Sequence, residues 1–464
     1  MRVELYGTMD FETLPKEELI VLLGQALGHI EAQEERIQSL ERVLVALQQE
    51  IDRLKGNPPP KPKPETPAFV KANAPKREPK TRKKRPHGFA RPRSEPTEVI
   101  SHYPETCSCC GRALSGGWLH RVREVIEIPE VTVRVIHHHL YARHCGVCHR
   151  REVASVDLSG EVVDQGRMGV RLMSLVAYLD TIARMPVELI QGLLSSLFGL
   201  SLSVGQICEI LHKVAQKGKP IYEELLVKLR AGPFLNADET GWRENGKNGY
   251  AWSFSNTEVE YFVCQRNRSA EVAKEVLGET FAGTLVSDFY SGYHWYTGRH
   301  QYCWPHLLRE LHALKEKHPD DPVLLAFAKG VRKIYDHAVR FKNANPLLRR
   351  DQRRLYEKQI TALARVHQGE ERPEHTLADR IIRRGHGLFT FVEHPEVPSN
   401  NNAAERSLRQ LVVMRKVSGG TRSDEGSKTV AILMSLFSTW KRQAQDTLDT
   451  CRQMLLGRLE PAKT

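Results

Sequence analysis

The sequence predicts a mixed α/β protein in which a sheet-containing core is preceded and interrupted by helical segments. Between residues 230 and 308, runs rich in aromatic residues and valine alternate with turn residues, as in strands. Residues 309–392 contain long runs of helix-forming residues instead. Because both patterns occur on one chain of 464 residues, we expect several parts with substantial cores.

Composition limits the class of protein. The formal net charge of +12 favours a polyanionic partner, although solubility alone would also explain it. No run approaches the roughly 18 apolar residues of a membrane span, and acids near the N-terminus argue against a signal peptide. We therefore expect a cytoplasmic protein that does not bind a membrane. Five of the nine cysteines fall between residues 107 and 148, which favours a metal site over a disulfide framework.

A seven-residue repeat over residues 19–55 predicts a coiled coil. One core position is taken by Ile30, Ile37, Leu44 and Ile51, and the other by Gln33, Leu40, Leu47 and Leu54. The alternative is an amphipathic helix packed on its own domain. A coiled coil would make the protein a homo-oligomer.

The segment that follows is rich in proline and lysine and predicts an extended tether. Between Lys61 and Arg93 it carries twelve Lys/Arg against two Glu. Such an arm would bind DNA phosphates with release of counterions, and the alternative is a solubilising linker. The candidate DNA-binding residues are Lys80, Arg82, Lys83, Lys84 and Arg85.

Two Cys-x2-Cys pairs predict a zinc-ribbon-like module that holds a structural Zn²⁺ ion. The pairs are Cys107 with Cys110 and Cys145 with Cys148, and 34 residues separate them. Four thiolates are a usual ligand set for structural zinc, and they leave no open position for catalysis. The segment between the pairs alternates apolar and polar residues, so we expect a hairpin that brings the second pair back to the first. Cys109 is a spare thiol next to the first pair.

Residues 166–218 predict two helices, with Gly199 ending the first and Ser203 capping the second. Their spacing resembles a helix-turn-helix, although any packed pair of helices looks similar.

The run "FLNADETGWR" predicts a strand that ends at Asp238, and in "GTLVSDFYSGY" Asp288 again ends an apolar run. The predicted order around them is β-β-β-α-β-α, which fits an RNase H-like sheet. In that order the strands of Asp238 and Asp288 are neighbours, so the two carboxylates would meet at one edge. Glu239 would point away from Asp238, because successive strand residues face opposite sides.

Glu405, in "PSNNNAAERSLR", is the third candidate acid. It stands three residues after Asn402, so the simpler interpretation is a helix capping box. The order of the three acidic motifs on one chain favours a shared site instead.

These patterns predict the following boundaries: coiled coil 1–56, basic linker 57–98, zinc-binding module 99–158, helical segment 159–229, first core part 230–308, helical insertion 309–392, and second core part with C-terminal helices 393–464.

The sequence resembles DDE transposases of the insertion-sequence 66 family over roughly residues 20–445. The resemblance rests on the cysteine pairs and on "ADET", "SDFYSGY", "CWPHLLREL" and "NNAAERSLR". It departs after the glutamate, at "VSGGTRSDEGSK". By resemblance the acidic triad is Asp238, Asp288 and Glu405, and His306 lies near it.

The resemblance implies a DNA transposase that binds the ends of an insertion sequence and a target. Cleavage and strand transfer would use two Mg²⁺ or Mn²⁺ ions held by the three acids. It also implies small accessory proteins as partners and an association with the bacterial nucleoid. Two alternatives are a catalytically inactive DNA-binding or regulatory protein with a nuclease-like core, and a resolvase-like nuclease.

Overall fold

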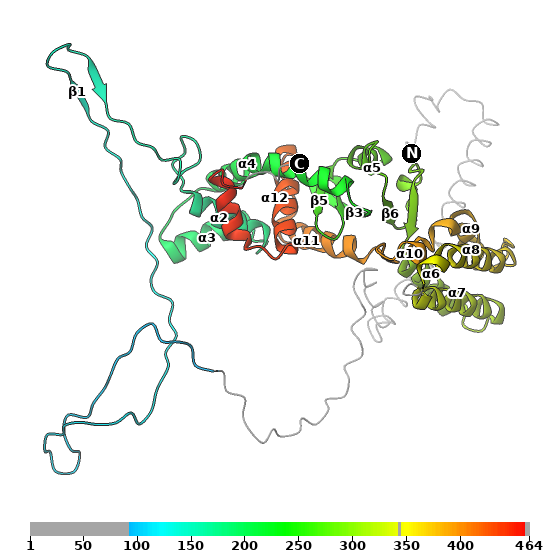
Figure 1. Cartoon of the computed structure of the whole chain (residues 1–464), viewed down its shortest axis with the longest axis horizontal. Coiled ribbons are helices and arrows are strands. Elements are labelled where there is room, and N and C mark those ends of the chain that lie inside the picture. Colours follow the sequence, from blue (N-terminus) through cyan, green and yellow to red (C-terminus); the bar gives the residue numbers. More distant parts are fainter. Residues whose placement is uncertain (1–91, 342–344, 460–464) are drawn as a thin grey trace, which may run out of the picture. The chain divides into compact units, whose positions relative to one another are not determined.

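The computed structural model describes residues 92–341 and 345–459 in two units, which divide after Gly117. The predicted coiled coil and the candidate DNA-binding residues Lys80, Arg82, Lys83, Lys84 and Arg85 lie outside the described residues. The chain is a mixed α/β protein with one five-stranded sheet (Figure 1).

The sheet has the order β5-β4-β3-β6-β7, with β3 in the centre. Strand β3 runs antiparallel to β4 and parallel to β6, and β6 runs parallel to β7. Its strands are β3 (Phe234–Glu244), β4 (Lys247–Ser255), β5 (Glu260–Gln265), β6 (Thr284–Ser287) and β7 (Arg299–Tyr302). The expected adjacency of the two acid-bearing strands is therefore confirmed.

The register of β3 and β6 explains why the two acids meet. Phe234 pairs with Thr284 and Asn236 with Val286. Carried two residues further, the same register brings Asp238 opposite Asp288, and neighbouring strands lie about 4.8 Å apart.

The sheet packs on both faces, because strand residues alternate between them. One face contributes Trp252, Phe254 and Tyr261 to a core shared with α5 (Ala270–Leu277) and with the helices at the left of Figure 1. The other face contributes Trp242, Ala251 and Phe262 to a core with α11 (Asn402–Ser418) and α12 (Asp424–Arg442). Helix α11 thus lies directly on β3 and β4.

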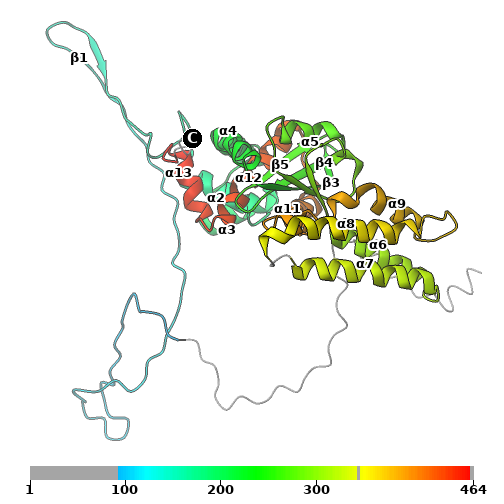
Figure 2. The same ribbon diagram turned by 45° about the vertical axis from the view of Figure 1, so that its right-hand side comes forward.

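Helices α2, α4, α12 and α13 pack together beside the sheet, and α12 contacts β5 (Figure 2). Gly199 ends α3 in the left-handed conformation, and Ser203 forms a capping box with Gln206, both as expected. The helix-turn-helix stays a prediction; α4 is 27 residues long and buries Ile207 and Val214. These helices are α2 (Val170–Thr181), α3 (Val187–Phe198), α4 (Val204–Arg230) and α13 (Thr447–Leu455).

The helical insertion follows β7, as the sequence predicts, and has its own apolar core around Trp304, Phe389 and Phe391. Its helices are α6 (Trp304–Lys317), α7 (Pro322–Phe341), α8 (Arg349–Arg365), α9 (His375–Arg384) and α10 (Thr390–Glu393), with short 3₁₀ turns η2 (Pro346–Leu348) and η3 (Gly385–Gly387). Within residues 92–341 and 345–459, no helix combines the length and the apolar character needed to cross a membrane.

The hairpin expected between the cysteine pairs is absent from the described chain. Residues 118–141 form no strand. Strands β1 (Ala142–His144) and β2 (Arg151–Val153) instead pair around the second cysteine pair. Residues 118–141 are exposed throughout, so their apolar side chains gain no burial that would hold two strands together.

Gln301 fastens the insertion to β7. Its buried side chain donates to the carbonyl oxygen of Leu388 at 3.0 Å and accepts from the backbone N–H of Phe391 at 3.0 Å. Replacing Gln301 with Ala leaves the buried N–H of Phe391 without its acceptor, at a cost of about 1–3 kcal/mol, and removes one of the two donors to the Leu388 carbonyl.

We expect the Gln301→Ala variant to lose about 2–4 kcal/mol of unfolding free energy in urea titrations. The matched control is Gln368→Ala, because Gln368 is exposed and bonds only to Asp379. Equal stability of the two variants would show that the Gln301 contacts do not hold the insertion.

Candidate active site

The three predicted acids come from three elements around the centre of the sheet. Asp288 directly follows β6, and Glu405 lies in the first turn of α11. Asp238 lies inside β3 rather than at its end, which corrects the sequence prediction. The reason is that β3 continues beyond β6 as a long hairpin with β4. Asp238 is therefore two residues past the point where the parallel pairing with β6 stops.

The acids share one face of the sheet. Phe234 lies four residues before Asp238, and Val286 lies two residues before Asp288, so each is on the same face of its strand as the acid. Both pack against Val397, in the segment that leads to α11. This face is the one that α11 covers.

Burial and like charge act together on Asp238. Burial, followed by the charges of Glu239 and Asp288, raises the pKa of Asp238 well above its usual range. The N–H of Glu239 opposes this shift by donating to Asp238 Oδ1 at 2.9 Å. A carboxylate in such a place is costly unless a cation or a proton accompanies it.

Glu239 is occupied by other partners. Its side chain is 2% exposed and accepts from Arg268 Nε at 2.8 Å and from the hydroxyl of Tyr293 at 2.5 Å. Burial raises the pKa of Glu239, and both donors oppose that shift. The Arg268 guanidinium also lies 3.9 Å from the centre of the Tyr290 ring. Glu239 thus ties the segment after Asp288 to strand β3.

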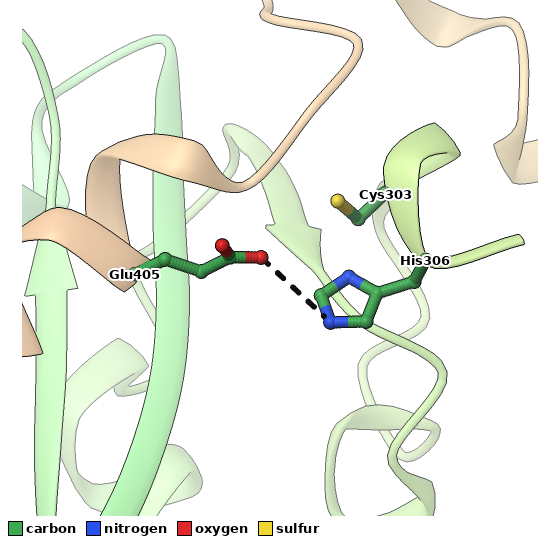
Figure 3. A group of neighbouring side chains, drawn as sticks. All are labelled: Cys303, His306 and Glu405. Atoms are coloured by element: carbon green, nitrogen blue, oxygen red, sulfur yellow. Dashed lines mark ion pairs between the residues drawn. The ribbon is translucent and has the colours of Figure 1, made fainter. Parts of the chain in front are cut away.

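Glu405 is not the partner of a capping box, which corrects the simpler interpretation. The residue that caps α11 is Asn401, and it makes no side-chain cap bond. The carboxylate of Glu405 instead accepts from Arg309 of α6 at 3.2 Å and lies 3.7 Å from His306 Nε2 (Figure 3). The expectation that His306 lies near the site is confirmed.

Asn401 connects the elements that carry the site. Its side-chain amide is fully buried and donates to the carbonyl oxygen of Ala237, next to Asp238, at 2.8 Å. Its backbone N–H donates to Cys303 Sγ at 3.2 Å, and its carbonyl accepts from the N–H of Glu405 at 3.2 Å.

The donor set suits hard divalent cations, because three carboxylates offer only oxygen ligands. Among the described residues, the potential ligand atoms that all lie within 4.8 Å of one another are those of Cys303, His306 and Glu405. Asp238, Asp288 and Glu405 do not form such a group there.

The two cysteine pairs have the same local geometry. The N–H of Cys107 donates to the carbonyl of Arg112 at 2.9 Å, and that of Cys145 to the carbonyl of Arg150 at 2.8 Å. Backbone N–H groups of Cys110 and Cys148, respectively, lower the pKa of the Cys107 and Cys145 thiols. Each pair is thus a turn that favours thiolates, the form that binds zinc.

Sequence reasoning missed Arg268, Arg309, Tyr293 and Asn401 as parts of the site. Tyr293 and Asn401 stand inside motifs already singled out, "SDFYSGY" and "SNNNAAER", so their position was a usable signal. Arg309 likewise stands inside "CWPHLLREL", whereas Arg268 lies in a loop outside these motifs and carries no such signal.

The comparisons with known proteins identify the family. The family model described as "Transposase IS66 family" matches residues 165–429, more than half of the chain. The model described as "zinc-finger binding domain of transposase IS66" matches residues 104–149, which include both cysteine pairs. The chain belongs to the IS66 family of transposases, which confirms the resemblance seen in the sequence.

One curated relative is the uncharacterized protein y4jO of Sinorhizobium fredii. It is 33% identical over 87 residues, which cover 19% of this chain and 27% of that protein. The chain thus matches about a quarter of that relative's length.

Tyr293→Phe tests the network around Glu239. Removing the hydroxyl deprives a buried carboxylate of a donor, and a bond to a charged group contributes about 1.5–3 kcal/mol. Tyr296→Phe is the matched control, because the Tyr296 hydroxyl donates to the neutral carbonyl of Gly283 at 2.8 Å. We expect the larger loss of unfolding free energy for Tyr293→Phe in denaturant titrations. An equal or smaller loss than for Tyr296→Phe would contradict an ionised Glu239.

Proposed function

We propose that this protein is a DNA transposase that cuts the ends of an insertion sequence and joins them to a target. The observation that carries the proposal is the convergence of Asp238, Asp288 and Glu405 on one face of the sheet. Membership in a transposase family supports it.

We further propose that the core is RNase H-like. In support, the central strand β3 is antiparallel to β4 and parallel to β6, and helix α5 separates the antiparallel strands from the parallel ones. In this arrangement α11 follows the helical insertion and places Glu405 on the face of the sheet that carries the other two acids.

In the proposed reaction, Asp238, Asp288 and Glu405 would hold two Mg²⁺ or Mn²⁺ ions. When bound, such ions activate an attacking water or 3′-hydroxyl and stabilise the leaving oxygen. The chain's own residues position the acids. Arg268 and Tyr293 hold Glu239 away from Asp238, so Glu239 is not free to act as a fourth ligand. Arg309 holds the carboxylate of Glu405.

DNA binding would use basic surfaces around the site. Arg406, Arg409 and Lys416 are exposed on α11, directly after Glu405. Their spacing of three and seven residues puts them on one side of the helix, where they would face phosphates. The basic arm that precedes the described residues would add contacts that carry no sequence information. The predicted coiled coil supports self-association, and small accessory proteins complete the proposed complex.

We expect Asp238→Asn, Asp288→Asn and Glu405→Gln each to lower strand cleavage by several orders of magnitude. These substitutions keep the shape but remove the anionic oxygen that holds the ion. Cleavage is measured with Mg²⁺ on a supercoiled donor that carries the terminal repeats flanking the gene. DNA binding, measured by gel shift, should change little.

The control is Asp449→Asn, because Asp449 is exposed on α13. Full cleavage by Asp238→Asn would refute the assignment of the acids. A wild-type protein that binds the ends but never cuts them would favour the alternative of a regulatory protein.

We also propose that Cys107, Cys110, Cys145 and Cys148 hold one structural Zn²⁺ ion. The zinc-finger match and the thiolate-favouring turns support this. We expect about one zinc per chain by mass spectrometry of the purified metal content, since four thiolates bind one ion. Cys110→Ser should lose the zinc, and the neighbouring Cys109→Ser should keep it. Zinc retained by both variants would assign the metal to other residues.

A further inference from the structure

A second group of metal-ligating side chains borders the proposed active site. Cys303 caps α6, His306 lies in its first turn, and Glu405 approaches from α11. Their ligand atoms all lie within 4.8 Å of one another, and Figure 3 shows the three side chains converging from the two helices. Phosphodiester cleavage by carboxylate-held ions has no use for a thiol, so the cysteine calls for a separate explanation.

The sulfur of Cys303 accepts a hydrogen bond from the backbone. Cys303 is fully buried, and the backbone N–H of Asn401 donates to its Sγ at 3.2 Å. An N–H donor of this kind stabilises negative charge on sulfur, as it does around cysteine-ligated metal centres. A metal ion that binds the sulfur displaces the thiol proton.

His306 has a ring nitrogen available to a ligand, and neutral imidazole is a common ligand of metals. Its Nδ1 is buried and has no hydrogen-bond partner among the described residues. The Nε2 atom lies 3.7 Å from Glu405 Oε1. That separation is slightly longer than the roughly 3.3–3.5 Å between a nitrogen and an oxygen bound at zinc distances in a tetrahedron, so a small side-chain movement brings both onto one ion.

We propose that Cys303, His306 and Glu405 form a binding site for a soft divalent cation such as Zn²⁺, and that its occupation withdraws Glu405 from the three acids. A thiolate with an imidazole selects zinc over magnesium, which prefers oxygen ligands. Three protein ligands leave a fourth position for water or a phosphate oxygen. The consequence, inhibition of cleavage by zinc, rests on the proposed function; the binding itself does not.

Binding is tested on the full-length protein, purified with its zinc, by titration with Co²⁺ as a spectroscopic probe. We expect a sulfur-to-cobalt charge-transfer band that is lost in Cys303→Ser and weakened more than about 10-fold in affinity in His306→Gln, since even loss of an outer partner costs 10–100-fold. Cys451→Ser is the matched control, because Cys451 is also a buried thiol whose pKa burial raises to about 12. Circular dichroism verifies that each variant is folded. If Cys303→Ser does not fold, the cobalt titration of His306→Gln alone decides whether the site binds metal.

Identical cobalt spectra for wild type, Cys303→Ser and His306→Gln would overturn the site. Inhibition is then measured as the effect of added Zn²⁺ on Mg²⁺-supported cleavage. We expect Cys303→Ser to need more than about 10-fold more zinc than wild type for the same inhibition. Equal sensitivity would overturn the inhibitory role while the cobalt result stands. A wild-type protein that does not cleave DNA would refute the proposed function, and the cobalt titration would still decide the metal site.

Discussion

The buried amide of Asn401 is the contact on which the geometry of the site depends. It joins the carbonyl of Ala237 in β3 to the start of α11, although the two residues are far apart in the sequence. The same residue meets Cys303 at the start of α6 and accepts the N–H of Glu405. A buried polar side chain that satisfies backbone groups on other elements is strongly held in place. Asn401 therefore holds the start of α11, which carries Glu405, against the part of β3 that carries Asp238.

Strand alternation gives the adjacent acids Asp238 and Glu239 different surroundings. The pleat directs Asp238 and Glu239 to opposite faces of β3. Glu239 forms an ion pair with Arg268 and accepts a hydrogen bond from Tyr293, so its burial is compensated within the protein. Asp238 has no comparable ion pair with a basic residue recorded among the described contacts, and its neighbours Glu239 and Asp288 raise its pKa. The fold thus leaves the carboxyl group of Asp238 without an ion pair among the described residues, on the face of the sheet that α11 covers.

The sequence predicted the sheet because periodicity reports local structure directly. All five strands of the core, the neighbouring positions of β3 and β6, and the helical insertion follow from alternation, turn residues and helix formers. Two expectations were wrong, namely the hairpin between the cysteine pairs and the end of a strand at Asp238, and the alternative of a capping box at Glu405 is not formed. Residues 118–141 alternate like strands, but they are exposed throughout and form no hairpin in the described chain. Asn402 with Glu405 reads as a capping box, yet Arg309 comes from a different element and attracts the carboxylate away. Side-chain partners that distant in sequence leave no mark on local pattern.

Contacts between the two ends of the helical insertion bring Glu405 back to the sheet. The backbone N–H of Trp304, where α6 begins, donates to the carbonyl of Ser399 at 3.1 Å, just before α11. The Trp304 indole donates to the carbonyl of Leu388 at 2.6 Å, and Thr390 donates to the carbonyl of His300. The two ends of the insertion are therefore fastened together beside β7. Since closing a loop costs free energy that grows only slowly with its length, the helices between these ends could change in size with little effect on Glu405. Glu405 therefore depends on the contacts that join the two ends of the insertion. Cys303 and His306 lie where these ends meet, and this position brings a thiol and an imidazole next to the carboxylate.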